Sequence, residues 1–161
     1  NGSRMPFSVV VDYAHTPDGL TEVLAAARSV VASDAAVIVV FGCGGDRDHA
    51  KRPAMGAAAA VGADRVVITS DNPRTENPMS IINDINEGVD DHYRDRVVSQ
   101  PDRRLAIGTA LDVARPGDIV VIAGKGHEQT QDLGGDVVAF DDRAVARSFL
   151  DMTTPESMDL L

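Results

Sequence analysis

The sequence predicts an α/β fold, in which a mostly parallel sheet of about six strands carries helices on both faces and one antiparallel strand at an edge. The main observation is that short runs rich in Val and Ile alternate along the chain with longer, helix-like runs. The chain has 161 residues, which fits one domain. Aromatic residues make up only 4% and Trp is absent, so we expect an aliphatic core.

The first half of the chain opens with a strand at residues 8–11, which is continuous and β-branched, as expected of a strand buried on both faces. A helix to about residue 32 follows, because Thr16 suits the N-cap and Pro17 suits the first helical position. The remaining elements expected before residue 93 alternate in type. They are a strand at 36–41, a helix at 53–62, a strand at 65–69 and a helix at 78–92.

The second half continues with a short strand at 96–98, a helix at 103–115 and a strong strand at 119–123. Roughly a dozen residues without a clear helix then lead to a weaker strand at 136–140. This connection favours an antiparallel strand at the sheet edge. A helix at 142–150 completes the fold, so we expect a domain at 7–151, a linker or remnant at 1–6 and a flexible tail at 152–161.

Composition excludes several classes of protein. The formal charge of −10 argues against nucleic-acid binding and against an anionic membrane surface. No run reaches the ~18 apolar residues of a membrane span, and we expect no signal peptide, because no charged-then-apolar pattern opens the sequence. The single cysteine, Cys43, rules out an internal disulfide and is expected to be a small buried thiol in a reducing compartment.

Four polar or glycine-rich segments come directly after predicted strands. Because the carboxyl ends of parallel strands meet at one rim of a sheet, we expect these segments to converge on a ligand-binding crevice. The segments are residues 12–15, 42–47, 71–74 and 124–128. A local basic pocket is possible there, made by Arg47, Lys51, Arg52 and Arg74.

The segment Asp71-Asn72-Pro73-Arg74 is the most informative of the four. Pro73 stiffens the turn, and Asn72 offers both hydrogen-bond donors and an acceptor. The planar guanidinium of Arg74 suits a carboxylate or a phosphate. These residues indicate a site for an anionic small molecule, although a β-turn with a surface arginine is the alternative.

Three familiar motifs are approached but not completed. Gly42 and Gly44 fit the dinucleotide fingerprint, but Arg47 occupies its third glycine position, which disfavours NAD. Gly124-Lys125 resembles the end of a P-loop without the Ser or Thr that should follow, so we expect no complete phosphate cradle in this chain. His127-Glu128 begins an incomplete H-E-x-x-H in a glycine-rich loop, and we expect no metal site.

Taken together and in this order, the motifs resemble the C-terminal domain of the Mur ligases, most closely the MurE branch. The resemblance covers about residues 7–150. The motifs are Asp12-Tyr13-Ala14-His15-Thr16-Pro17, then Phe41-Gly42-Cys43-Gly44-Gly45-Asp46-Arg47-Asp48 with Lys51-Arg52-Pro53, then Asp71-Asn72-Pro73-Arg74, and finally Gly124-Lys125-Gly126-His127-Glu128.

The resemblance implies a Rossmann-like domain and a role in peptidoglycan-precursor synthesis in the bacterial cytoplasm. In the family reaction, ATP phosphorylates the D-glutamate carboxylate of UDP-MurNAc-L-Ala-D-Glu, and the amine of meso-diaminopimelate attacks the acyl phosphate to form an amide. ATP and Mg²⁺ would be bound mainly by a central domain. We expect that domain and the UDP-binding N-terminal domain to be missing, which would leave this fragment monomeric and inactive alone.

The resemblance also implies residue roles. The residues implied to bind diaminopimelate are Arg47, Asp71, Asn72, Pro73, Arg74, Gly124 and Glu128. The two arginines suit carboxylates and Glu128 suits an ammonium group. Asp12 and His15 are implied to lie near ATP, although a helix-leading carboxylate and a structural hydrogen bond are their alternatives. The roles of Lys51, Lys125 and His127 stay open.

Three other hypotheses remain to be compared. A lysine-adding Mur ligase or a folylpolyglutamate-type ligase would keep the superfamily, but Arg74 speaks against lysine, because that guanidinium would be left unpaired. A stand-alone binding module would need a complete pocket within these residues. A dehydrogenase domain is disfavoured by Arg47.

Overall fold

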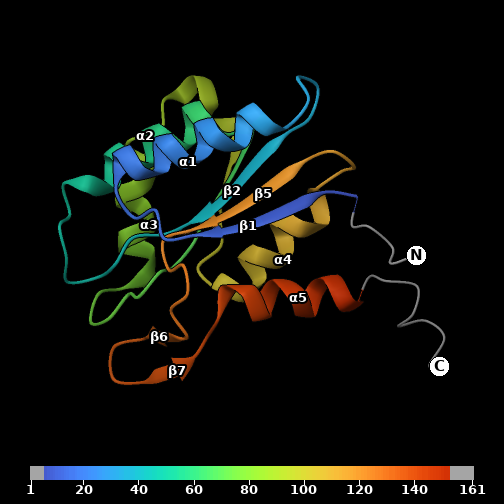
Figure 1. Cartoon of the computed structure of the whole chain (residues 1–161). Coiled ribbons are helices and arrows are strands. Elements are labelled where there is room, and N and C mark those ends of the chain that lie inside the picture. Colours follow the sequence, from blue (N-terminus) through green and yellow to red (C-terminus); the bar gives the residue numbers. More distant parts are fainter. Residues whose placement is uncertain (1–5, 153–161) are drawn as a thin grey trace.

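The computed structural model describes residues 6–152 and contains a five-stranded sheet in which all strands are parallel (Figure 1). The predicted α/β class and the parallel sheet are confirmed. In spatial order the strands are β1 (Ser8–Asp12), β5 (Ile119–Ala123), β2 (Val37–Phe41), β3 (Arg65–Ile68) and β4 (Val97–Ser99). The residues assigned to the linker lie mostly outside the described part, and so do residues 153–161 of the predicted tail.

Helices cover both faces of the sheet, as predicted (Figure 1). One layer holds α1 (Pro17–Val30), α2 (Lys51–Gly62) and α3 (Pro78–Glu87), and the other holds α4 (Arg103–Val113) and α5 (Asp142–Met152). The central strand β2 is fully buried and divides its side chains between the layers. Val37, Val39 and Phe41 pack under the first layer, whereas Ile38 and Val40 pack under the second.

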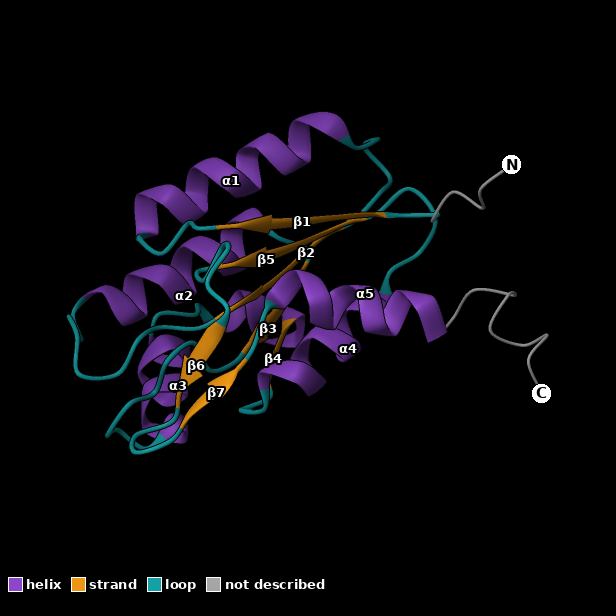
Figure 2. Ribbon diagram, turned by 60° about the horizontal axis from the view of Figure 1, so that its bottom comes forward, coloured by secondary structure: helices purple, strands orange, loops and turns teal. Residues whose placement is uncertain are grey.

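The antiparallel edge strand is a wrong prediction. Strand β7 (Val137–Ala139) is antiparallel, but it pairs with β6 (Thr130–Asp132), a strand that we did not predict. The two form a separate ribbon near the carboxyl ends of the sheet strands (Figure 2). Gly134 and Gly135, with φ of 78° and 130°, turn the chain back at once, so the nearest partner for β7 is the segment just before the turn.

Strand β1 was expected to be buried on both faces, but it lies at the edge of the sheet. Val10 is 37% exposed, and all five residues of β1 remain at least partly exposed. An apolar, β-branched run fits an edge strand as well as a central one. Its pattern depends on whether the faces of the sheet are covered by helices, and not on whether the strand has a neighbour on one side or on both. The opposite edge is the short strand β4.

The helix termini follow local signals. Thr16 caps α1 as predicted, with its Oγ1 accepting from Gly19 N at 3.0 Å. The helix predicted at 78–92 ends at Glu87, and a 3₁₀ helix (Asp91–Arg96) follows. Gly88 is the C-cap of the α-helix, and Asp90 caps the 3₁₀ helix, because its carboxylate accepts from His92 N. Within residues 6–152, no helix combines the length and the apolar character that crossing a membrane requires.

Candidate functional site

The four polar segments meet at the carboxyl end of the sheet, around an open pocket of about 430 Å³. Six of the seven predicted amino-acid-binding residues line it, and His15 lines it as well. These six are Arg47, Asp71, Asn72, Arg74, Gly124 and Glu128. The convergence follows from the adjacency of β1, β5, β2 and β3, whose carboxyl ends all carry one of the segments.

The loops after β2 and β3 are joined by reciprocal hydrogen bonds. Gly45 N donates to Asn72 O at 2.8 Å, and Arg74 Nη1 donates back to Gly45 O at 2.8 Å. A side chain at position 45 would lie 1.8 Å from the carbonyl oxygen of Pro73, so this approach requires glycine. Pro73 is therefore buried structural support, and it does not line the pocket itself.

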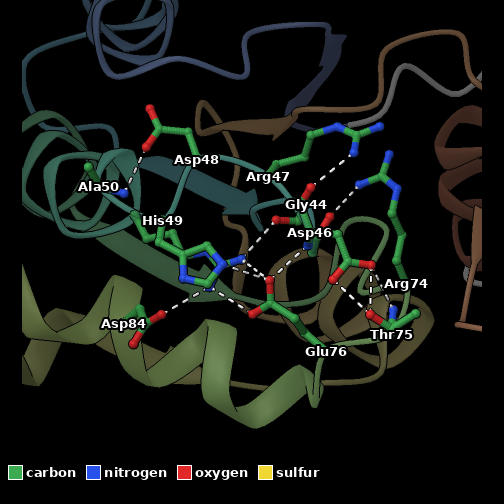
Figure 3. A network of polar contacts seen from close by, with 12 residues as sticks. Gly44, Asp46, Arg47, Asp48, His49, Ala50, Arg74, Thr75, Glu76 and Asp84 are labelled. Carbon is green, nitrogen blue, oxygen red and sulfur yellow. Dashed lines mark hydrogen bonds and ion pairs between the residues drawn. The ribbon is translucent and has the colours of Figure 1, made fainter.

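A second set of contacts crosses between the same loops (Figure 3). Asp46 N donates to Glu76 Oε1 at 2.7 Å, while the Asp46 carboxylate accepts from Thr75 N and from the Thr75 hydroxyl. Asp46 and Arg74 both have left-handed backbones, with φ of 56° and 52°. Such a conformation costs a non-glycine residue about 1 kcal/mol or more, so the crossed bonds hold the turns that present Arg47 and Arg74 to the pocket.

Arg52 does not belong to the pocket, which corrects our expectation that it contributes to a basic patch there. Its side chain is fully buried behind the loop and pairs with Glu76 at 2.8 Å and with Asp84 at 3.0 Å. Its Nη2 also donates to Gly44 O at 3.1 Å. The hydrogen bond from Arg52 is the main cause that lowers the pKa of Glu76 to about 2, and the bond from Asp46 N adds to it.

Beneath the pocket lies a buried ion pair between Arg103 and Asp142, at the start of α4 and α5. The Arg103 guanidinium donates to both carboxylate oxygens, at 2.8 and 2.7 Å. It also donates to Ser70 O and to Ala123 O, the residues just before Asp71 and Gly124. Arg103 thus joins the carboxyl ends of β3 and β5, and it ties both to α5.

Asp71 lies on the wall where β3 and β5 end. Burial raises the pKa of its carboxyl, against the opposing influence of Arg103 and Lys125. Gly124 has a φ of 112°, and a side chain there would stand 2.8 Å from Asp71 Oδ2. The glycine therefore permits the close approach of the carboxylate to the loop after β5.

The opposite wall of the pocket comes from the segment after β1. Lys51 Nζ donates to His15 O at 3.0 Å, and His15 Nδ1 lies 2.9 Å from Tyr13 O, so His15 does make the structural hydrogen bond that was its alternative role. Its side chain is nevertheless exposed on the pocket lining. Asp12 does not line the pocket, because its Oδ1 accepts from Ala14 N at 2.8 Å and closes the turn that leads toward α1.

Cys43 is a buried thiol, as predicted. Burial raises its pKa to about 12, and its Sγ lies 3.6 Å from Met55 Sδ. It is therefore unsuited to act as a nucleophile near neutral pH. Within the described part of the chain, no three His, Cys, Asp or Glu side chains gather as a metal site would need.

Sequence reasoning missed the roles of Arg52, Arg103 and Asp142. A signal was present, because each begins a helical stripe whose later members are apolar and buried. The stripes continue at Met55, Gly56, Ala59 and Ala60, at Ala106, Ile107, Ala110 and Leu111, and at Val145 and Ala146. A charged residue at the head of such a stripe points toward the interior and needs a partner there.

Comparison with known proteins gives a consistent result. Residues 2–126 match the family model described as "Mur ligase, glutamate ligase domain". The chain is 56% identical over 145 residues to a UDP-N-acetylmuramoyl-L-alanyl-D-glutamate–2,6-diaminopimelate ligase of Solibacter usitatus. The aligned residues cover 90% of this chain and 29% of that protein. An enzyme of the same name from Bacteroides fragilis is 47% identical over 151 residues, covering 94% of this chain and 31% of that protein.

Solved structures agree. A structure of an enzyme with the same name superposes with a TM-score of 0.85 at 48% identity, and the match covers 91% of this chain and 30% of that one. Escherichia coli FolC in complex with ADP, at 16% identity and a TM-score of 0.54, shares the fold alone. The chain spans about 30% of the length of the relatives that it matches.

Proposed function

The chain belongs to the Mur ligase family, and we propose that it is the C-terminal domain of an ATP-dependent ligase that adds meso-diaminopimelate to UDP-MurNAc-L-Ala-D-Glu. The observation that carries this proposal is the charge pattern of the pocket. The guanidinium groups of Arg47 and Arg74 and the carboxylate of Glu128 line the same cavity, together with the charged residues Lys51, Asp48 and Asp71. Relatives at 47–56% identity are named diaminopimelate ligases, which favours this substrate over lysine and over a folate.

The pocket complements an amino acid with a free carboxylate and a free ammonium group. Arg74 and Arg47 bind the carboxylate at the end of diaminopimelate that does not react, and Glu128 binds the ammonium group beside it. Lysine has no carboxylate at that end, so its binding would desolvate the arginines without giving them a partner. The site therefore discriminates through the arginines.

In the complete enzyme, the amine at the other end of diaminopimelate attacks an acyl phosphate and displaces phosphate, which forms the amide of the peptidoglycan precursor. Bound ATP and Mg²⁺ supply the phosphoryl group and stabilise its charge. We assign both mainly to a central domain of the enzyme outside this chain, as the family resemblance implies. His15 and Asp12 would face ATP from the side of this domain. We expect the complete enzyme to be monomeric and cytoplasmic.

The test is an NMR titration of the isotope-labelled chain with meso-diaminopimelate and, separately, with L-lysine. We expect shifts at Arg47, Asn72, Arg74 and Glu128 with diaminopimelate alone. Equal shifts with both ligands would contradict selection by the arginines. If neither ligand binds, the test moves to amide formation by the whole ligase, where loss of diaminopimelate preference in Arg74→Ala, but not in the surface variant Arg94→Ala, is the expected result.

A further inference from the structure

Lys125 is a lysine with no ammonium hydrogen to spare for a ligand. Its side chain is fully buried, although it follows directly after the pocket residue Gly124. The ammonium nitrogen lies 3.0 Å from Asn72 Oδ1, 3.3 Å from Glu128 Oε2 and 2.7 Å from Thr130 O. Three acceptors match three N–H donors, so the whole hydrogen-bonding capacity of the lysine is used inside the protein.

The first of these bonds fixes the orientation of a pocket amide. Asn72 Oδ1 accepts from Lys125 Nζ and also from Asp132 N at 3.0 Å, which uses both of its lone pairs. A flipped amide would place the Nδ2 hydrogens against the ammonium group and against an N–H. Asn72 therefore turns its Nδ2 donors toward Glu128, whose Oε2 lies 3.4 Å away.

The second bond, from Lys125 to Glu128, gives the two oxygens of the Glu128 carboxylate different roles. Oε2 accepts from Lys125 and from Asn72, so that this oxygen is held by the protein. The other oxygen, Oε1, is left for a ligand. Because Glu128 is 37% exposed on the pocket lining, its free oxygen can meet an ammonium group of the ligand.

Burying a cation costs hydration free energy, so the contacts of each buried cation indicate what it is buried for. The other two fully buried cations of residues 6–152 are Arg52 and Arg103. They donate to backbone carbonyls, that of the pocket residue Gly44 included, and their acidic side-chain partners do not line the pocket. Lys125 instead contacts two side chains that do. Its contacts are therefore those expected of a residue that serves recognition.

We propose that Lys125 is a positioning residue that sets the polarity of the pocket, by holding Asn72 as a donor and Glu128 as an acceptor for the incoming amino acid. The proposal rests on the proposed function for the identity of the ligand. It deepens that function, because it assigns the discrimination between the ammonium and carboxylate groups of the ligand partly to a residue that does not touch it.

The first experiment needs no ligand, so its outcome is independent of the proposed function. The side-chain amide of Asn72 is followed by NMR in the wild-type chain, in Lys125→Met and in the surface control Arg94→Met. We expect the two Nδ2 proton signals to move and their rotational exchange to become faster in Lys125→Met only. Unchanged Asn72 signals in Lys125→Met would overturn the proposal.

The second experiment uses the whole ligase. Lys125→Met should raise the KM for diaminopimelate about 10- to 100-fold with a smaller change in the KM for ATP, and Lys125→Arg should restore part of the loss. In a Glu128→Gln background the same substitution should raise KM by much less, because Lys125 acts through Glu128. Equal factors in both backgrounds, or a parallel loss in all kinetic constants, would show a merely structural role.

Discussion

At the two ends of the parallel sheet, side chains of opposite charge bind the backbone groups that the strands leave free. At the amino end, carboxylates accept from backbone N–H groups: Asp64 from Val37 N and Asp118 from Ala36 N, each at 2.8 Å. At the carboxyl end, cations donate to backbone carbonyls, as Arg103 does to Ser70 O and Ala123 O. Parallel strands end in free N–H groups on one side and free C=O groups on the other, and each charge type serves the groups that it can bind.

The difference explains how a chain with a formal charge of −10 can present cationic side chains at one end of its sheet. Its three fully buried cations, among the described residues, lie at the end of the sheet that carries the pocket. Two of them hold backbone that leads into the pocket, so Arg47 and Arg74 are left to face the cavity. The net charge of a chain therefore predicts little about the charge of a pocket at one end of it.

The largest expected effect comes from breaking the carboxyl-end ion pair. Arg103→Met leaves Asp142 buried without its partner and leaves two carbonyls without a donor. We expect the free energy of unfolding to fall by about 3–5 kcal/mol, measured by urea denaturation. The double variant Arg103→Met with Asp142→Asn should lose less, because no charge remains buried alone. A loss below about 1 kcal/mol in the single variant would contradict the comparison.

A smaller effect is expected at Glu76, whose carboxylate accepts from Asp46 N in the loop after β2 (Figure 3). The same carboxylate accepts from the buried Arg52. Its pKa is lowered from 4.5 to about 2, chiefly by the hydrogen bond from Arg52. The carboxylate therefore contributes stability that is fully present above about pH 4.5 and is lost as the pH falls toward about 2.

Glu76→Gln should reduce the free energy of unfolding by about 2 kcal/mol at neutral pH. It should also flatten the acid limb of the stability profile, since the amide does not titrate. Urea denaturation at a series of pH values measures both effects, and Glu22→Gln on the exposed side of α1 serves as the control. An acid limb as steep as that of the wild type would show that Arg52 does not depend on Glu76.

The sequence predicted what local patterns control. Alternating strand and helix runs, together with the polar segments after them, located the sheet and six of the pocket residues. The sequence alone could not identify the partners of buried charges. Arg103 and Asp142 lie 39 positions apart, and they meet only when α4 and α5 pack together. The β6–β7 ribbon was not predicted for a related reason. Strand β6 is polar and short, and it is held by a contact that is distant in sequence, between Asp132 N and the side chain of Asn72.

The smallest effect is expected at the amino end. Asp64 is 41% exposed, and although burial acts to raise its pKa, the hydrogen bond from Val37 N and the contact with Arg28 lower it on balance. Its contribution to stability is present above its usual pKa of 3.8 and declines as the pH falls below that value. Because water screens the exposed pair, Asp64→Asn should cost less than about 1 kcal/mol, and the amide oxygen can still accept from Val37 N.

The same variant tests whether the two ends act independently. Asp64 lies at the end of the sheet opposite the pocket, so the diaminopimelate-induced NMR shifts of Asp64→Asn should match those of the wild type. Urea denaturation and the titration together measure both properties on one sample. If Asp64→Asn lost as much stability as Arg103→Met, the greater solvent exposure of Asp64 would not explain a difference in stability between the two ends. Altered shifts at Arg74 would mean that the amino end of the sheet also affects the structure of the pocket.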